Sequence, residues 1–235
     1  MTINQFVPDL SLLLESRIGE IRKRICNAAQ RFGRDASEVH LMAVTKTVPA
    51  ETVNIAIEQG VDLLGENRVQ EFLSKYSVYR TTAANIHFIG HLQTNKVKKI
   101  VDKVSMIESV DSISLAKEIN DEAGKRNRIM PILLEINIGE EKTKFGFFPS
   151  QMKSALEELS KLPNIQVSGL MTIPPKRDGK LYFRKMQRLY IDISNQNMDN
   201  INMSYLSMGM SEDFESAVEC GANIIRIGTA IFGKR

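Results

Sequence analysis

The sequence predicts an α/β protein, a (β/α)8 TIM barrel with an extra N-terminal helix. Eight short runs rich in apolar and β-branched residues alternate with longer amphipathic segments, which is the pattern of successive βα units. Eight such units close a TIM barrel, and 235 residues suit one barrel domain over residues 1–235. A doubly wound open sheet uses the same units, but no GxGxxG motif follows any of the runs.

The elements follow in a regular order. Apolar residues at helical spacing between Pro8 and Gly33 predict a leading amphipathic helix that ends at the glycine. The predicted strands lie at residues 40–45, 62–67, 86–90, 105–110, 131–137, 167–171, 204–209 and 223–228. The predicted helices lie at residues 50–60, 67–77, 94–103, 112–125, 149–161, 179–195 and 211–221.

The composition narrows the class of protein. With 31 basic and 28 acidic residues the net charge is +3, too balanced for a nucleic-acid binder. Cys26 and Cys220 form neither a disulfide framework nor a metal-ligand pair, so we expect reduced thiols. The start of the chain lacks the features of a secretory signal and no later run suits a bilayer, which predicts a cytoplasmic protein without membrane contact. No long apolar surface stripe demands assembly, so we expect a monomer.

Lys46 is the first candidate site residue. Alternate side chains of a barrel strand face the interior, and Met42, Val44 and Lys46 share one face. If that face is the inner one, Lys46 stands at the carboxyl-terminal mouth, where barrel enzymes carry their active sites. A neutral lysine amine there can attack a carbonyl group. The alternative is a solvated lysine at a strand end.

Arg226 and its neighbours form the second candidate group. Ile225 and Ile227 share one face of the last predicted strand, which places Arg226 on the other. A guanidinium inside a barrel requires a ligand or an ion-pair partner, for which Glu66, Glu108 and Glu135 are available. TIM barrels often bind phosphate with the loops after strands seven and eight and a short extra helix. Ser207, Gly228 and Thr229 occupy those loops.

Two further features are weaker. Asn67 lies two residues beyond Gly65 on the same face of the second predicted strand, as either a hydrogen-bonding site residue or a helix cap. His87 and His91 have a spacing that converges on a metal only within a helix, and His87 falls on a strand, so we predict no metal site.

A lysine at the mouth opposite a phosphate cup suggests a phosphorylated aldehyde held as a Schiff base. Here the sequence strongly resembles the YggS/PROSC family of pyridoxal phosphate homeostasis proteins over nearly its whole length. The motifs that carry the resemblance are "AVTKTVPAE", "GENRVQE", "HFIGHLQTNK", "SVDSISLAKEIN", "EINIGEEKTKFGF", "GLMTIPP", "LSMGMSEDFESAVECGA" and "RIGTAIFG".

The resemblance implies a fold-type III barrel, similar to the N-terminal domain of alanine racemase, that binds pyridoxal 5'-phosphate (PLP). It implies a covalent aldimine on Lys46, Arg226 facing the pyridine nitrogen, and Asn67 near the cofactor ring. Ser207, Gly228 and Thr229 are expected to hold the phosphate. Many relatives carry a second lysine where this chain has Val48, so a relay through that amine is not expected. The serine that often precedes the aldimine lysine is Thr45, which keeps a hydroxyl.

Three functions remain open on the sequence. The first is a PLP-binding protein that buffers the cofactor or delivers it to apo PLP-dependent enzymes, and so influences amino-acid and keto-acid balance without catalytic turnover. The second is a PLP-dependent amino-acid racemase, with Lys46 as one base and another residue as the second. The third is a lysine-dependent aldolase, which needs a proton-shuttling partner near Lys46 and no permanent cofactor.

Overall fold

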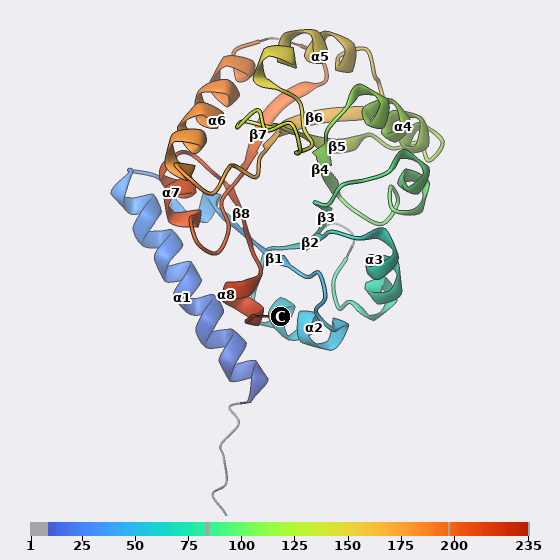
Figure 1. Ribbon diagram of the computed structural model, residues 1–235. Helices are drawn as coiled ribbons and strands as arrows, with labels where there is room; N and C mark the ends of the chain where they lie inside the picture. The colour runs from blue at the N-terminus through green and yellow to red at the C-terminus, as the bar shows by residue number, and fades with distance from the viewer. Residues whose placement is uncertain (1–8, 83–84, 197, 235) are drawn as a thin grey trace, which may run out of the picture.

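The computed structural model describes residues 9–82, 85–196 and 198–234. Eight parallel strands form a closed barrel in chain order, and β8 returns to pair with β1 (Figure 1). The (β/α)8 prediction is confirmed. The strands are β1 (His40–Val44), β2 (Leu63–Glu66), β3 (Ile86–Phe88), β4 (Met106–Val110), β5 (Met130–Glu135), β6 (Ile165–Met171), β7 (Ile201–Ser207) and β8 (Ile224–Ile227).

Helices surround the barrel on its outside, as the ring in Figure 1 shows. They are α1 (Leu10–Arg31), α2 (Ala50–Glu58), α3 (Val69–Lys75), α4 (Ile113–Gly124), α5 (Met152–Leu159), α6 (Gly179–Ser194), α7 (Phe214–Glu219) and α8 (Thr229–Phe232). Within the described residues, no helix combines the length and the apolar character needed to cross a bilayer.

The segment between β3 and β4 differs from its prediction. Residues 94–103 were expected to form an α-helix, but η4 (Thr94–Lys99) is a 3₁₀ helix followed by turns. Val97 and Ile100 are both fully buried and lie three residues apart. Side chains at this spacing eclipse one another in a 3₁₀ helix, so the tighter helix directs this apolar pair into the core.

The leading helix α1 is the extra element of the barrel. The Asp9 side chain caps it by accepting from the Ser11 N–H, and Gly33, with φ of 66°, follows its end in the left-handed region. Its buried face, which includes Ile18 and Ile21, packs against α7, α8 and α2 on the outside of the barrel (Figure 1). Burial of each such side chain contributes about 1.5–3 kcal/mol.

The alternation of side chains divides β8 between two environments. Ile225 and Ile227 belong to the large apolar layer between barrel and helices, whereas Ile224 packs inside the barrel against Met42. Arg226 therefore shares the inner face with Ile224, as predicted, and is only 4% exposed. A charged group thus lies directly above an apolar interior layer.

Candidate functional site

One cavity at the carboxyl-terminal mouth brings together most of the predicted site residues. It has a volume of about 790 Å³, and Lys46, Arg226, Gly228 and Thr229 all line it. Its other walls come from the loop after β6 and the loop after β7. These are strand-to-helix loops, the side on which TIM-barrel enzymes carry their active sites.

The turn that carries Lys46 is held from outside by α3. Thr47 adopts φ of 59° in the left-handed region, which costs a β-branched residue on the order of 1–3 kcal/mol. The Thr47 N–H donates to Glu71 Oε1 at 2.5 Å, and Lys75 Nζ donates to the same oxygen at 2.9 Å and to the Thr45 carbonyl at 3.0 Å. These bonds fix the turn, and the fixed turn directs Lys46 to the cavity.

The hydroxyl of Thr45 has a defined partner. Thr45 Oγ1 donates to Glu66 Oε1 at 2.7 Å, and the Tyr79 hydroxyl donates to the same oxygen. Glu66 is therefore on the helix side of the barrel, close to Lys75 Nζ at 3.6 Å, and does not face Arg226. The Thr45 hydroxyl thus ties the start of the Lys46 turn to Glu66 at the end of β2.

Arg226 is held in a buried chain of hydrogen bonds. Its Nη1 donates to Ser207 Oγ at 2.7 Å and its Nη2 to the Thr172 carbonyl at 2.8 Å. Ser207 Oγ donates in turn to Glu108 Oε2 at 2.6 Å, and the other Glu108 oxygen lies 2.6 Å from His87 Nδ1. Of the candidate partners, Glu108 is thus joined to Arg226 through Ser207.

The charges of Arg226 and Glu108 stabilise each other within this hydrogen-bonded series. Burial lowers the pKa of Arg226, while the negative charges of Glu108 and Glu135 oppose that shift. Burial alone raises the pKa of Glu108, but the hydrogen bond and attraction of His87, together with the charge of Arg226, bring it below its ordinary value. A charged Glu108 therefore compensates the guanidinium inside the barrel.

Two predicted site residues lie outside the cavity lining. Ser207 is fully buried, and its hydroxyl is committed to Arg226 and Glu108. Asn67 follows β2 and is half-buried, yet its Oδ1 is a buried oxygen without a hydrogen-bond partner. An orphaned acceptor of this kind at the mouth end of a strand suits contact with a bound molecule.

Glu135, at the end of β5, was considered only as an ion-pair partner. Burial and the neighbouring charge of Asp111 raise its pKa to about 7, against a smaller opposing effect of Arg226. It shares the inner face of β5 with Leu133. A carboxyl that keeps its proton near neutral pH on the inner side of the barrel was not visible in the sequence, because its burial and the approach of Asp111, which follows β4, arise only in the folded barrel.

The raised pKa of Glu135 predicts a pH-dependent stability difference. The folded protein holds the proton up to a pH of about 7, whereas an unfolded glutamate releases it near its ordinary value of 4.5. The wild type therefore loses stability as pH rises through this window, and Glu135→Gln does not. Between pH 5 and pH 8 the free energy of unfolding of the variant, measured by urea denaturation, should rise by about 2–3 kcal/mol relative to that of the wild type. An unchanged difference would contradict the assignment.

The cavity contains residues that the sequence analysis missed. Ser211, Asp213, Lys176 and Lys234 line it, and the Ser211 hydroxyl accepts from the Ala230 N–H of α8 at 3.3 Å. The signal for Ser211 was the second serine of "LSMGMS", which follows the predicted strand by two residues. Lys176 lies in the long loop "TIPPKRDGK", which sequence reasoning marked only as a functional loop.

The two histidines of the "HFIGHLQTNK" segment have separate partners. His87 bonds to Glu108, whereas His91 Nδ1 lies 3.0 Å from Asp111 Oδ2 and its ring stacks on Phe145. Among the residues that the structure describes, no group of three or more His, Cys, Asp or Glu side chains is arranged to hold a metal ion.

The fold and the mouth cavity define a barrel of the alanine racemase class. Residues 18–235 match the family model described as alanine racemase, N-terminal domain. Among curated relatives, a pyridoxal phosphate homeostasis protein from Aquifex aeolicus is 44% identical over 223 residues, which cover 93% of this chain and 97% of the relative. The chain therefore belongs to the family of the pyridoxal phosphate homeostasis proteins.

Solved structures agree with this assignment. PipY from Synechococcus elongatus, solved with PLP bound, is 31% identical with a TM-score of 0.80, covering 94% of this chain and 100% of that one. A protein of unknown function from Bifidobacterium adolescentis is 32% identical with a TM-score of 0.88, covering 97% of this chain and 98% of that one.

Proposed function

We propose that this chain binds PLP in the mouth cavity and takes part in intracellular PLP homeostasis, as a buffer or carrier of the cofactor, and through it in amino-acid and keto-acid balance. The observation that carries the proposal is that Lys46, Arg226, Gly228 and Thr229 line one cavity. The names of the curated relatives and the PLP bound to PipY support it.

The residues of the cavity fit this cofactor. Its volume of about 790 Å³ lies within the usual range for cofactor sites. Its lining offers the amine of Lys46, the guanidinium of Arg226, and hydroxyl groups that include that of Thr229. PLP supplies an aldehyde, a phosphate and a pyridine nitrogen, and each group has a candidate partner in this set.

Lys46 is the residue that we propose for the covalent link. Lys46 would hold the aldehyde carbon of PLP through a C=N bond, with the carbonyl oxygen released as one molecule of water, so no oxidant or reductant would be needed. The strained turn at Thr47, held by Glu71, fixes the direction of the lysine before the cofactor arrives. Prior orientation of this kind lowers the entropic barrier of the addition.

Arg226 favours holding of the cofactor over turnover. A guanidinium does not give up its proton, so against the pyridine nitrogen of PLP it would donate a hydrogen bond and discourage protonation there. The ring is then a weak electron sink, which suits cofactor storage better than transamination. The hydrogen bonds of Arg226 to Ser207 and Thr172 fix the position of the guanidinium along the barrel axis.

We propose that Gly228 and Thr229 hold the phosphate group of PLP. Ser207, the last residue of β7, is proposed as a third phosphate residue. The first N–H groups of a helix have no partner within the helix, and α8 begins at Thr229. Since the Ser207 hydroxyl already bonds to Arg226 and Glu108, its substitution would also disturb the buried chain. Ser211, which lines the cavity, is a further hydroxyl for this group.

Thr229→Val tests the phosphate assignment without touching the buried chain. Loss of a charge-assisted hydrogen bond of about 1.5–3 kcal/mol should weaken PLP binding roughly 10- to 100-fold. The affinity for unphosphorylated pyridoxal should stay within about 2-fold, because it makes no such bond. Both are measured by absorbance titration, with the exposed Thr94→Val as the matched control. Equal weakening of the two ligands would exclude a phosphate role.

We further propose that the holo-protein does not racemise amino acids at an enzyme-like rate. Two-base racemisation needs a proton donor on each face of the α-carbon. No tyrosine is among the described residues that line the mouth cavity. The Tyr79 hydroxyl donates to Glu66, the Tyr190 hydroxyl donates to the Met203 carbonyl, and Tyr205 lines a cavity at the other end of the barrel. Tyr76 packs on Phe72, and Tyr182 lies under Lys185.

Incubation with L-alanine in heavy water tests this. We expect no steady formation of D-alanine, followed by chiral chromatography, from the wild type or from Glu135→Gln, which removes the carboxyl that holds a proton at neutral pH. Production that disappears in Lys46→Ala would establish a racemase instead. Delivery to apo PLP-dependent enzymes, a cytoplasmic location and a monomeric state stay predictions of the same proposal.

A further inference from the structure

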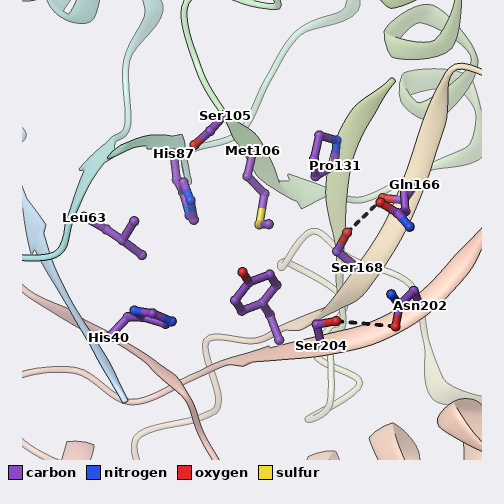
Figure 2. Close-up of a pocket in the computed structure, with 11 residues that line it drawn as sticks. His40, Leu63, His87, Ser105, Met106, Pro131, Gln166, Ser168, Asn202 and Ser204 are labelled. Carbon is purple, nitrogen blue, oxygen red and sulfur yellow. Dashed lines mark hydrogen bonds between the residues drawn. The ribbon is translucent and has the colours of Figure 1, made fainter. Parts of the chain in front are cut away.

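A second cavity lies at the opposite, amino-terminal end of the barrel (Figure 2). Its volume is about 410 Å³, and it shares no lining residue with the cavity that contains Lys46. Its walls come from the beginnings of the strands, with His40 on β1, Leu63 on β2 and His87 on β3, and from β4 to β7 on the other side. The PLP proposal makes no use of it.

A bulge in β7 builds one wall of this cavity. Val167 pairs with Ile201 and Gly169 with Tyr205, so one residue of β6 opposes three of β7 between these pairs, and the register shifts there. The bulge is possible because Gly169 has no side chain: a Cβ there would meet the Tyr205 carbonyl oxygen at 1.8 Å. Bulges re-aim side chains, and here Asn202, Ser204 and Tyr205 all line the cavity.

The polar groups of this cavity are imidazoles, amides and hydroxyls, with no carboxylate among them. No Asp, Glu, Lys or Arg occurs among its 11 lining residues. His87 is only 5% exposed, and among the described residues its recorded hydrogen bond is made by Nδ1, which leaves Nε2 for the cavity. Figure 2 shows the rings of His87 and His40 on the same side of the open space.

The two sides of the cavity differ in chemistry. Facing the imidazoles, β6 and β7 present the amides of Gln166 and Asn202 and the hydroxyls of Ser168 and Ser204 (Figure 2). Apolar groups of Met106 and Pro131 lie between the two polar sides, and Leu63 lies beside the two histidines. A molecule that fits needs an apolar middle and a hydrogen-bonding group at each end.

We propose that this amino-terminal cavity binds a small organic acid of amino-acid size, with its carboxylate on His40 and His87 and a second polar group on the amides and hydroxyls of β6 and β7. The contact at His87 uses the imidazolium form, in which both ring nitrogens donate: Nδ1 to Glu108 and Nε2 to the ligand oxygen. The buried Glu108, whose pKa is lowered, compensates that positive charge. A charge-assisted bond of this kind is about twice as strong as a neutral one. Glu108 fixes the His87 ring for this contact through Nδ1, in the manner of an orienting carboxylate.

The site is joined to the mouth cavity by a continuous set of contacts. His87 Nδ1 lies 2.6 Å from Glu108 Oε1, Glu108 Oε2 lies 2.6 Å from Ser207 Oγ, and Ser207 Oγ lies 2.7 Å from Arg226 Nη1. A ligand oxygen at His87 Nε2 would extend this series by one contact. The barrel interior is thus polar from one opening to the other along this line, while apolar side chains fill the rest.

Calorimetric titration of glutarate into the full-length Lys46→Ala variant tests the proposal, since this variant has no amine at position 46 for the carbonyl chemistry of the mouth. Glutarate should bind saturably, and its diamide, of the same length but without charge, about 10-fold or more weaker. His40→Ala, at a half-buried ring, and His87→Gln should each weaken glutarate about 10-fold or more. His91→Ala, an exposed histidine at the mouth end, is the matched control and should change it less than 2-fold.

The results that overturn the proposal are equally specific. Absence of saturable binding, equal binding of acid and diamide, or an affinity that His40→Ala leaves unchanged would each exclude the site. If His87→Gln fails to fold, His40→Ala decides, because no hydrogen bond of its ring occurs among the described residues and its removal leaves the Glu108 chain intact. None of these outcomes depends on whether PLP binds at Lys46.

Discussion

Lys46→Ala should abolish the visible absorption band of the purified protein, because no other amine is held at the end of β1 by a fixed turn. In the wild type, borohydride should reduce the C=N bond and leave the cofactor attached to the peptide that contains Lys46. Peptide mapping by mass spectrometry reads the position of attachment. The loss of the band should be complete, since the band requires the covalent bond itself.

Lys176→Ala and Lys234→Ala are the matched controls. Both lysines line the same cavity as Lys46. Neither lies on the strained turn, so each variant should keep the band and the same reduced peptide. Attachment to Lys176 or Lys234 in the wild type would refute the assignment of Lys46 while leaving PLP binding by the cavity in place.

Arg226→Met should destabilise the apo-protein by about 3–5 kcal/mol, the cost of leaving a buried charge without its partner. Glu108 is fully buried, and its ionised form is favoured by the groups around it. Methionine also leaves the Ser207 hydroxyl and the Thr172 carbonyl without their guanidinium donor. Urea denaturation of both proteins without cofactor measures the difference.

The double variant Arg226→Met with Glu108→Gln separates charge from packing. Glutamine keeps an acceptor for the Glu108 partners and removes the charge, so more than half of the lost stability should return. A double variant less stable than Arg226→Met alone would show that lost packing, and not an unpaired carboxylate, is the main cause.

Local patterns were sufficient to predict the parts of the site that lie on strands. The isoleucines on either side of Arg226 made its face unambiguous, and the guanidinium is inside the barrel. The proline that closes the β1 turn and the alternation of Met42, Val44 and Lys46 likewise placed the lysine at the mouth. A period of two along a strand depends on a few neighbouring residues, so the sequence contains it directly.

What could not be predicted depends on contacts between distant parts of the chain. The bonds of the Ser207 hydroxyl to Glu108, 99 positions away, and to Arg226 could not be predicted from the sequence. The predicted β7 began at residue 204, whereas the strand starts at Ile201 and has Asn202 and Ser204 near its start. These polar residues line the amino-terminal cavity, whose existence depends on the bulge opposite Gly169.

The pairing of β1 with β8 also determines when the mouth cavity can form during synthesis. Lys46 follows the first strand and Thr229 begins the helix after the last one, so a nascent chain that ends before Thr229 lacks one side of the cavity. At about 5–20 residues per second, synthesis takes on the order of 10–50 s. During this time β1 is an unpaired edge on one side, and α1 lacks the α7 and α8 surfaces that cover it. A chain in which β8 has not yet paired with β1 therefore lacks one wall of the mouth cavity, so PLP binding has to follow the closure of the barrel.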